Sequence, residues 1–159
     1  MRKITNPYIS IEGYHCFGCC PDNQMGLQMN FYEEGEEVCC RWTPRGYYQG
    51  YKNMLHGGIQ ATLMDELAGW TVSVKLGTNG VTYHIDLKYR KPVLVTGGDI
   101  LLKARIMKVE KRIATLSVAL YDGNNTLCSE GTCEYFVLPE EKARKEFYYP
   151  GKEKFFSGD

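Results

Sequence analysis

A histidine, two glycines and an aspartate are spaced along residues 56–65 in a way that suits acyl-group chemistry. His56-Gly57-Gly58 stands where a helix would start, and glycines there let a ligand approach the backbone N–H groups that a helix leaves unpaired. Those donors and the positive end of the helix dipole suit a carbonyl oxygen that acquires negative charge. Asp65 follows on the order of 10 Å further along the same helix. The combination indicates acyl transfer. The alternative is a glycine turn before an ordinary helix whose aspartate pairs with a lysine, since that arrangement would show the same sequence pattern.

The helix that must hold these residues is predicted from an apolar repeat after Gly58. Its members are Ile59, Leu63, Leu67, Trp70 and Val74. Asp65 projects from roughly the opposite side, among small and apolar neighbours, so we expect a substrate or a second subunit to approach that face. Glu66 lies about 100° round the helix and is expected to be structural or a surface charge.

Strand patterns dominate the remainder of the chain, two before the helix and four after it. The predicted strands are Leu27–Glu33, Glu36–Thr43, Val81–Arg90, Asp99–Val109, Ile113–Tyr121 and Thr126–Val137. In the strand that follows the helix, alternation places Thr82, His84 and Asp86 on one polar face. One sheet with a single long helix to cover it predicts an α+β fold.

The two ends of the chain carry weaker signals. Residues 1–15 lack a clear period and are predicted to be a loose lead-in to one domain that extends to residue 138. Residues 139–159 form a charged and aromatic C-terminal tail, expected to be solvated or packed against a neighbour. Within it, Glu140–Phe147 is predicted as a short helix, and Pro150-Gly151 is expected to stop any element after it.

Length and composition exclude several classes of protein. The 159 residues suffice for one domain with a real core, and the formal net charge of zero gives no reason to expect a nucleic-acid partner. Residues 1–10 lack the apolar core of an export signal, and no run is long enough to span a bilayer. We therefore expect a cytoplasmic protein with no nucleic-acid or membrane partner.

The cysteines raise the question of a metal. There are seven, an odd and unevenly spaced set, which favours reduced thiols over a disulfide framework. Cys16 and Cys19 have C-x-x-C spacing, but structural zinc needs four ligands and no second pair with matching spacing follows. The sequence therefore predicts that these two thiols are reduced and hold no metal.

Several stretches together resemble the hotdog-fold acyl-CoA thioesterases, and most closely the phenylacetyl-CoA thioesterase (PaaI-type) branch. They are His56-Gly57-Gly58 followed after six residues by Asp65, the opening CFGCCPDNQMGL at residues 16–27, Tyr48-Gln49-Gly50, and the strand end Tyr89-Arg90-Lys91-Pro92. The resemblance covers residues 16 to about 138. It departs from the family pattern at Cys20 and Asn53, where glycine is usual or common.

The resemblance implies a hotdog fold, in which a curved antiparallel sheet wraps one long helix. It implies that Gly57, together with Gly58, presents backbone N–H groups to the thioester carbonyl. Asp65 would act as the general base for water or as the nucleophile, and Thr82 would help to position the water. The site would lie between two subunits of a homodimer or of a dimer of dimers.

Substrate-binding roles are also implied, and no cofactor is expected beyond the coenzyme A of the substrate. Gln49 and His56 would shape the pocket and orient the carbonyl. Arg90 and Lys91 belong to a basic segment that would bind the phosphates of coenzyme A, although lysines also protect solvated strand edges. Two other functions stay open on this fold: a hydratase or dehydratase, and a non-catalytic acyl-CoA-binding module.

Overall fold

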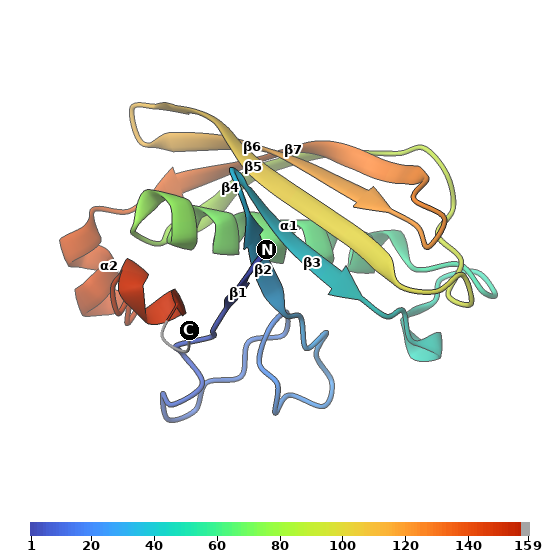
Figure 1. Cartoon of the computed structure of the whole chain (residues 1–159), viewed down its shortest axis with the longest axis horizontal. Coiled ribbons are helices and arrows are strands. Elements are labelled where there is room, and N and C mark those ends of the chain that lie inside the picture. The colour runs from blue at the N-terminus through green and yellow to red at the C-terminus, as the bar shows by residue number, and fades with distance from the viewer. Residues whose placement is uncertain (157–159) are drawn as a thin grey trace.

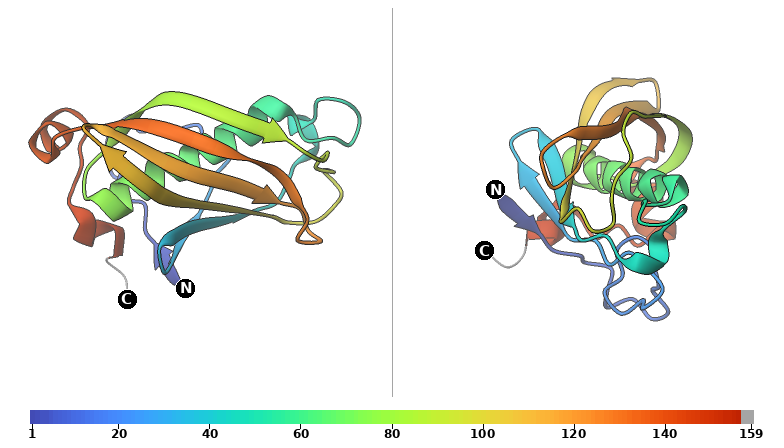
Figure 2. Two further views of the ribbon diagram at one scale, coloured as in Figure 1. Left: turned by 90° about the horizontal axis from the view of Figure 1, so that it is seen from above. Right: turned by 90° about the vertical axis from the view of Figure 1, so that its right-hand side faces the viewer.

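A 20-residue helix, α1 (Gly57–Leu76), runs through the middle of the molecule, and one antiparallel sheet curves round it (Figure 1). The computed structural model describes residues 1–156. Seen end-on, the helix lies in the hollow of the sheet (Figure 2). This confirms the predicted α+β class and the hotdog arrangement.

The sheet has seven strands, and every neighbouring pair is antiparallel. The strands are β1 (Arg2–Ile4), β2 (Phe31–Glu34), β3 (Glu37–Trp42), β4 (Gly80–Tyr89), β5 (Ile100–Glu110), β6 (Ile113–Tyr121) and β7 (Leu127–Val137). Their order across the sheet is β1-β2-β3-β5-β6-β7-β4. Within the described residues, the strand that follows the helix, β4, therefore lies at an edge and is paired only with β7.

The predicted strands exist, with one marked shift of boundary. The first was expected to begin at Leu27, whereas β2 begins at Phe31. Residues 27–29 pair instead with the preceding turn, because the Leu27 N–H donates to the Phe17 carbonyl at 2.7 Å and that of Met29 to Gly18 at 2.9 Å. The lead-in also contains β1, a strand of three residues, too short to show a period in the sequence.

A bulge in β4 overturns the predicted polar face of that strand. The register with β7 shifts between Thr82 and His84, where Thr82 is opposite Tyr135 and His84 opposite Glu134. A bulge turns the side chains that follow it to the other face. Thr82 therefore faces the helix, whereas His84 and Asp86 lie on the opposite face of the sheet.

The core lies between α1 and the concave face of the sheet. The predicted apolar stripe is buried from Leu63 to Val74, and Ile59 at its start is half-buried. Trp70 stacks on Phe31 of β2 with ring centroids 4.5 Å apart. It also meets Tyr8 and Phe155 edge-on, at 6.3 and 5.5 Å, and so extends the core toward both ends of the described chain.

The described part of the chain also contains three short helical elements: η1 (Gly46–Tyr48), α2 (Glu140–Glu146) and η2 (Lys152–Phe156). The prediction that Pro150-Gly151 stops any later element is wrong, because η2 follows it directly. Phe155 of η2 is fully buried, and its carbonyl accepts from the Thr5 N–H at 2.8 Å. The last three residues of the predicted tail, 157–159, lie outside the described part of the chain.

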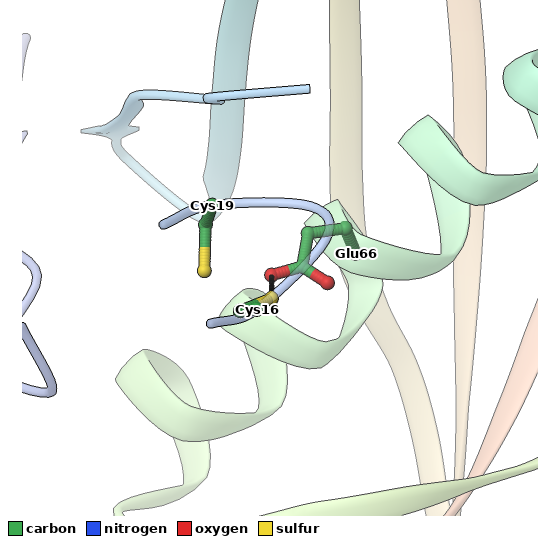
Figure 3. Close-up of side chains that lie close together, drawn as sticks. All are labelled: Cys16, Cys19 and Glu66. Atoms are coloured by element: carbon green, nitrogen blue, oxygen red, sulfur yellow. Dashed lines mark hydrogen bonds between the residues drawn. The ribbon is translucent and has the colours of Figure 1, made fainter. Parts of the chain in front are cut away.

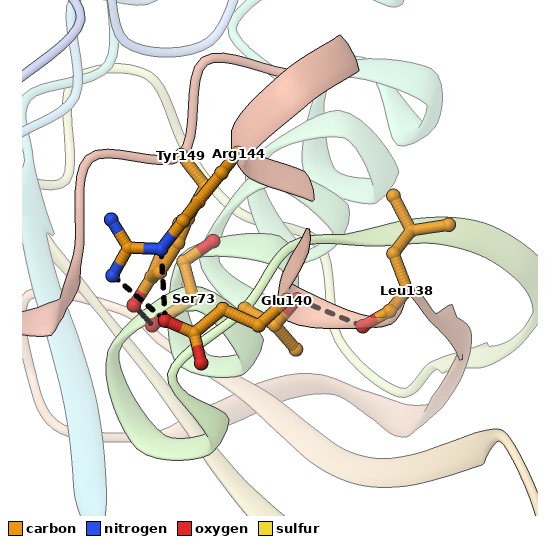
Figure 4. A network of polar contacts seen from close by, with 6 residues as sticks. Ser73, Leu138, Glu140, Arg144 and Tyr149 are labelled. Atoms are coloured by element: carbon orange, nitrogen blue, oxygen red, sulfur yellow. Dashed lines mark hydrogen bonds and ion pairs between the residues drawn. The ribbon is translucent and has the colours of Figure 1, made fainter. Parts of the chain in front are cut away.

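The tail is attached to α1 by polar contacts as well (Figure 4). The Tyr149 hydroxyl donates to the Ser73 carbonyl at 3.2 Å, and the Arg144 guanidinium pairs with Glu140 one turn earlier in α2. Among the described residues, no helix is long and apolar enough to cross a membrane.

Candidate active site

Asp65 is half-buried on α1, and two hydroxyl groups of the sheet hold its carboxylate. Thr82 of β4 donates to Oδ1 at 2.9 Å. The Tyr135 hydroxyl of β7 lies 2.5 Å from the same oxygen and 2.6 Å from the Asp65 backbone carbonyl, so its one proton is shared between these two acceptors. Burial and the neighbouring carboxylate raise the pKa of Tyr135, which keeps this hydroxyl protonated as a donor. Within residues 1–156 the other oxygen, Oδ2, has no hydrogen-bond partner. One side of the carboxylate is thus fixed, and the other is open to a ligand.

Sequence reasoning named Thr82 for this site but missed Tyr135. The two residues that contact Asp65 are opposite one another on β4 and β7, and the bulge described above is what brings Thr82 inward. Gly69, one turn after Asp65, makes room for the phenol, because a Cβ at that position would lie 3.3 Å from the Tyr135 hydroxyl. One of the small residues near Asp65 on α1, Gly69, thus makes room for a contact within the chain. A tyrosine at an alternate position of a predicted strand gives no signal of such a role.

Asp65 faces a cavity of about 850 Å³. Part of its wall comes from segments outside the predicted site: Tyr8 and Tyr14 of the N-terminal segment, and Phe147 and Tyr148 after α2. The lead-in and the tail, which the sequence assigned no role, therefore help to enclose the space beside Asp65.

At the start of α1, the two predicted N–H donors differ in what they contact. The Gly58 N–H donates to Nδ1 of His56 at 2.9 Å, so His56 caps the helix with its side chain. Within residues 1–156 the Gly57 N–H has no partner, and the Tyr89 hydroxyl donates to the Gly57 carbonyl at 2.7 Å. In this geometry the Gly57 N–H is the free donor of the two within residues 1–156, and the Gly58 N–H is occupied.

The loop before the helix is braced by Gln49, whose side-chain oxygen accepts from the Asn53 N–H at 2.5 Å. Asn53 has a φ of 61°, a left-handed conformation that asparagine tolerates and glycine favours. Asn53 also exchanges two hydrogen bonds with Thr96. The departure from the family's glycine at this position is thus compatible with the loop, and Gln49 acts within the chain as a loop brace.

Arg90 and Lys91 follow β4 and border a smaller hollow of about 280 Å³ together with Gly57. The Arg90 guanidinium forms a partly exposed ion pair with Glu130 at 3.0 Å, whereas Lys91 is exposed. Asp65 does not border this hollow. One chain therefore holds the predicted residues in two groups: Asp65 and Thr82 at the large cavity, and Gly57, Arg90 and Lys91 at the small one.

We expect Tyr135→Phe to lower kcat for any reaction in which Asp65 takes part by about 10- to 100-fold, and to leave KM nearly unchanged. The phenyl ring fills the same space, but the carboxylate loses a charge-assisted hydrogen bond of about 1.5–3 kcal/mol that orients it. Steady-state kinetics on the purified variant measure the effect, with Tyr32→Phe on β2 as the matched control. Equal kcat values for Tyr135→Phe and the wild type would show that the hydroxyl does not position Asp65.

Comparison with known proteins finds a family model that matches part of this chain. The model of the thioesterase superfamily matches residues 52–129, a stretch that contains the start of α1, Asp65 and Thr82. Over these residues the chain is similar to the thioesterase superfamily.

Two relatives and one solved structure illustrate the likeness. A protein of Saccharolobus solfataricus with a provisional esterase name is 24% identical over 94 residues, which is 58% of this chain and 61% of the relative. Acyl-coenzyme A thioesterase 13 of Mus musculus is 29% identical over 86 residues, 54% of this chain and 61% of the relative. A Streptococcus mutans protein solved bound to acetyl-CoA superposes with a TM-score of 0.66 at 19% identity, covering 82% of this chain and 98% of that one. The chain spans about three-fifths of the length of the two sequence relatives.

Proposed function

We propose that the protein hydrolyses acyl-CoA thioesters to the free acid and coenzyme A. The observation that carries this proposal is the Asp65 carboxylate, held by Thr82 and Tyr135 on one side and open on the other to a cavity of about 850 Å³. The named acyl-CoA thioesterase relatives and the acetyl-CoA-bound structural neighbour support a thioester of coenzyme A as the substrate.

In the proposed reaction, the substrate carbonyl accepts a hydrogen bond from the Gly57 N–H, near the positive end of the α1 dipole. Asp65 removes a proton from water, the water oxygen attacks the carbonyl carbon, and the tetrahedral intermediate expels the coenzyme A thiolate. The thiolate takes up a proton and the acid is released. Asp65 acting as the nucleophile, through an anhydride that water then opens, gives the same products. A thiolate is a good leaving group, so the proposal requires no organic cofactor.

The division of the site residues between two cavities supports a site shared by two subunits. Gly57 lies about eight residues before Asp65 on the same helix, on the order of 12 Å away along the axis. A substrate carbonyl that is bound at the Gly57 N–H of one subunit can therefore reach an Asp65 carboxylate only if that carboxylate comes from α1 of another subunit. Arg90 and Lys91 border the Gly57 hollow and would then lie near the coenzyme A phosphates.

We expect the protein to be at least a dimer, and a dimer of dimers is the favoured assembly. The edge strand β4 is long and is paired on one side only, and it exposes Tyr83 at 66% and Tyr89 at 51%. Such an edge is a template for pairing with another chain. Light scattering at micromolar concentration measures the state, and Tyr83→Lys, which places a charge at the edge, should weaken association. A stable and fully active monomer would contradict the shared site.

A reducing compartment such as the cytoplasm is part of the proposal. All seven cysteines are free thiols in the fold, and six of them are buried. Buried thiols without disulfide partners are typical of proteins from reducing compartments.

The two other functions on this fold give different products. A hydratase would add water to an enoyl-CoA and leave the thioester intact, and a binding module would leave every acyl-CoA intact. Two of the three histidines are poorly placed for hydratase chemistry, since His56 caps the helix and His84 lies on the far face of β4. Mass spectrometry of the products of an enoyl-CoA and its saturated counterpart separates the three functions. Free acid and coenzyme A from the saturated substrate support hydrolysis, and hydroxyacyl-CoA as the sole product would contradict it.

A further inference from the structure

The C-x-x-C turn at residues 16–19 lies against α1, where Glu66 meets the two cysteines (Figure 3). The two sulfur atoms and a carboxylate oxygen of Glu66 all lie within 4.8 Å of one another. The Cys16 thiol donates a hydrogen bond to Glu66 Oε1, with 3.3 Å between the sulfur and the oxygen. The turn is closed by the Cys20 N–H, which donates to the Cys16 carbonyl at 3.2 Å. Cys16 and Cys19 thus form one cluster of metal-ligating atoms with Glu66, which lies about 50 positions later in the chain.

Gly18, between the two cysteines, is shaped to admit the carboxylate. A Cβ on Gly18 would lie 2.3 Å from Cδ of Glu66 and 2.5 Å from its Oε2. Any side chain at this position would therefore push Glu66 away from the thiols. Glycine at this position leaves the space in which the carboxylate and both sulfur atoms lie close together beside the backbone.

Neighbouring side chains orient the potential ligands. The Trp70 indole donates to Glu66 Oε1 at 3.1 Å, and the Tyr14 hydroxyl lies 2.9 Å from the Cys19 sulfur. Asn6 donates to the Cys19 carbonyl at 3.2 Å, which fixes the end of the turn. Such outer contacts are what hold ligands in place at known metal centres.

The electrostatics of the cluster favour a cation. Within residues 1–156, Glu66 has no ion-pair partner. A cation beside this carboxylate would offset its negative charge, and that of the sulfur atoms once they have lost their protons.

We propose that Cys16, Cys19 and Glu66 bind one Zn²⁺ ion. With Zn–S near 2.3 Å and Zn–O near 2.0 Å, tetrahedral geometry puts a sulfur and an oxygen ligand about 3.5 Å apart, close to the observed Cys16–Glu66 spacing of 3.3 Å. Binding releases one proton from each of the two thiols. The sequence predicted no metal because no second ligand pair follows the cysteines, whereas the fold supplies a third ligand from α1.

Three protein ligands leave a fourth position for water, and all three residues border the cavity that Asp65 faces. The ion would fasten the N-terminal segment to α1 and so fix the wall that Tyr14 and Cys16 contribute to that cavity. This inference does not depend on the proposed hydrolysis, since it concerns metal binding alone.

The test uses the chain of 159 residues, reduced and stripped with a chelator. Titration with Zn²⁺ against a chromophoric chelator should give one equivalent per chain, and Co²⁺ in its place should give sulfur-to-cobalt charge-transfer absorption with the visible bands of a tetrahedral ion. Cys16→Ala, Cys19→Ala and Glu66→Gln should each weaken Zn²⁺ binding by at least about a hundredfold, because even outer contacts account for 10- to 100-fold.

Cys20→Ala and Cys39→Ala are the matched controls, and both should bind Zn²⁺ as the wild type does. Circular dichroism checks that each variant folds. If Cys19→Ala does not fold, the cobalt spectrum of the wild type and the Zn²⁺ affinity of Glu66→Gln still test the proposed site. Substoichiometric binding by the wild type, or unchanged affinity in Glu66→Gln, would overturn the proposal.

Discussion

Asp65→Asn is expected to lower kcat for acyl-CoA hydrolysis by about 10²- to 10⁴-fold, and by more if Asp65 is the nucleophile. The amide oxygen of asparagine can still accept from Thr82 and Tyr135, so the side chain keeps its position. What is lost is the negative charge that activates water or attacks the thioester. Substrate binding should change little because the Gly57 N–H is untouched. Steady-state kinetics and the affinity for an unreactive acyl-CoA analogue measure the two effects separately.

The matched control is Asp22→Asn, which makes the same chemical change at an exposed position of the N-terminal loop. It should retain wild-type kcat and KM. Removal of the charge from half-buried Asp65 should not unfold the protein, since it lowers a desolvation cost. An Asp65→Asn variant that folds and keeps wild-type kcat would show that the reaction is carried by another group.

Trp70→Ala is expected to lower the free energy of unfolding by about 3–5 kcal/mol, the usual loss for a large buried aromatic residue. Its side chain lies where α1, β2 and η2 meet, stacked on Phe31 and edge-on to Phe155 and Tyr8. The substitution therefore removes contacts to both ends of the chain at once. Urea denaturation at a fixed protein concentration measures the loss.

Trp70→Phe separates the contribution of the aromatic ring to stability from that of the indole N–H group. Phenylalanine keeps most of the stacking but loses the hydrogen bond to Glu66, so the expected loss is smaller, about 1–3 kcal/mol. A loss below about 1 kcal/mol in Trp70→Ala would mean that the two chain ends are not held to the helix through this residue.

The sequence contained enough information to predict the central helix and most strands. The apolar repeat from Leu63 to Val74, the glycines before it and the period-two runs after it are local patterns, and local patterns are what a single sequence shows. The positions of Gly57, Asp65 and Thr82 followed from the resemblance. Their contacts did not, since Thr82 reaches Asp65 only because a bulge interrupts the alternation of β4.

Contacts between distant residues could not be predicted in the same way. Tyr135 is 70 residues from Asp65, and Glu66 is 50 residues from Cys16. No spacing rule connects such pairs; only the pairing of strands and the packing of the helix bring them together. The same holds for the tail, where Phe155 is buried although the surrounding sequence is charged.

The central claim, thioester hydrolysis by this chain, is tested most directly by the release of coenzyme A thiol from a panel of acyl-CoAs. The panel should include short, medium-chain and aromatic acyl groups, with purified wild-type protein and Asp65→Asn measured side by side under reducing conditions that do not interfere with thiol detection. We predict steady thiol release by the wild type from at least one member, and a loss of about 10²-fold or more in Asp65→Asn. Binding of acyl-CoAs by the wild type without thiol release from any of them would contradict the account.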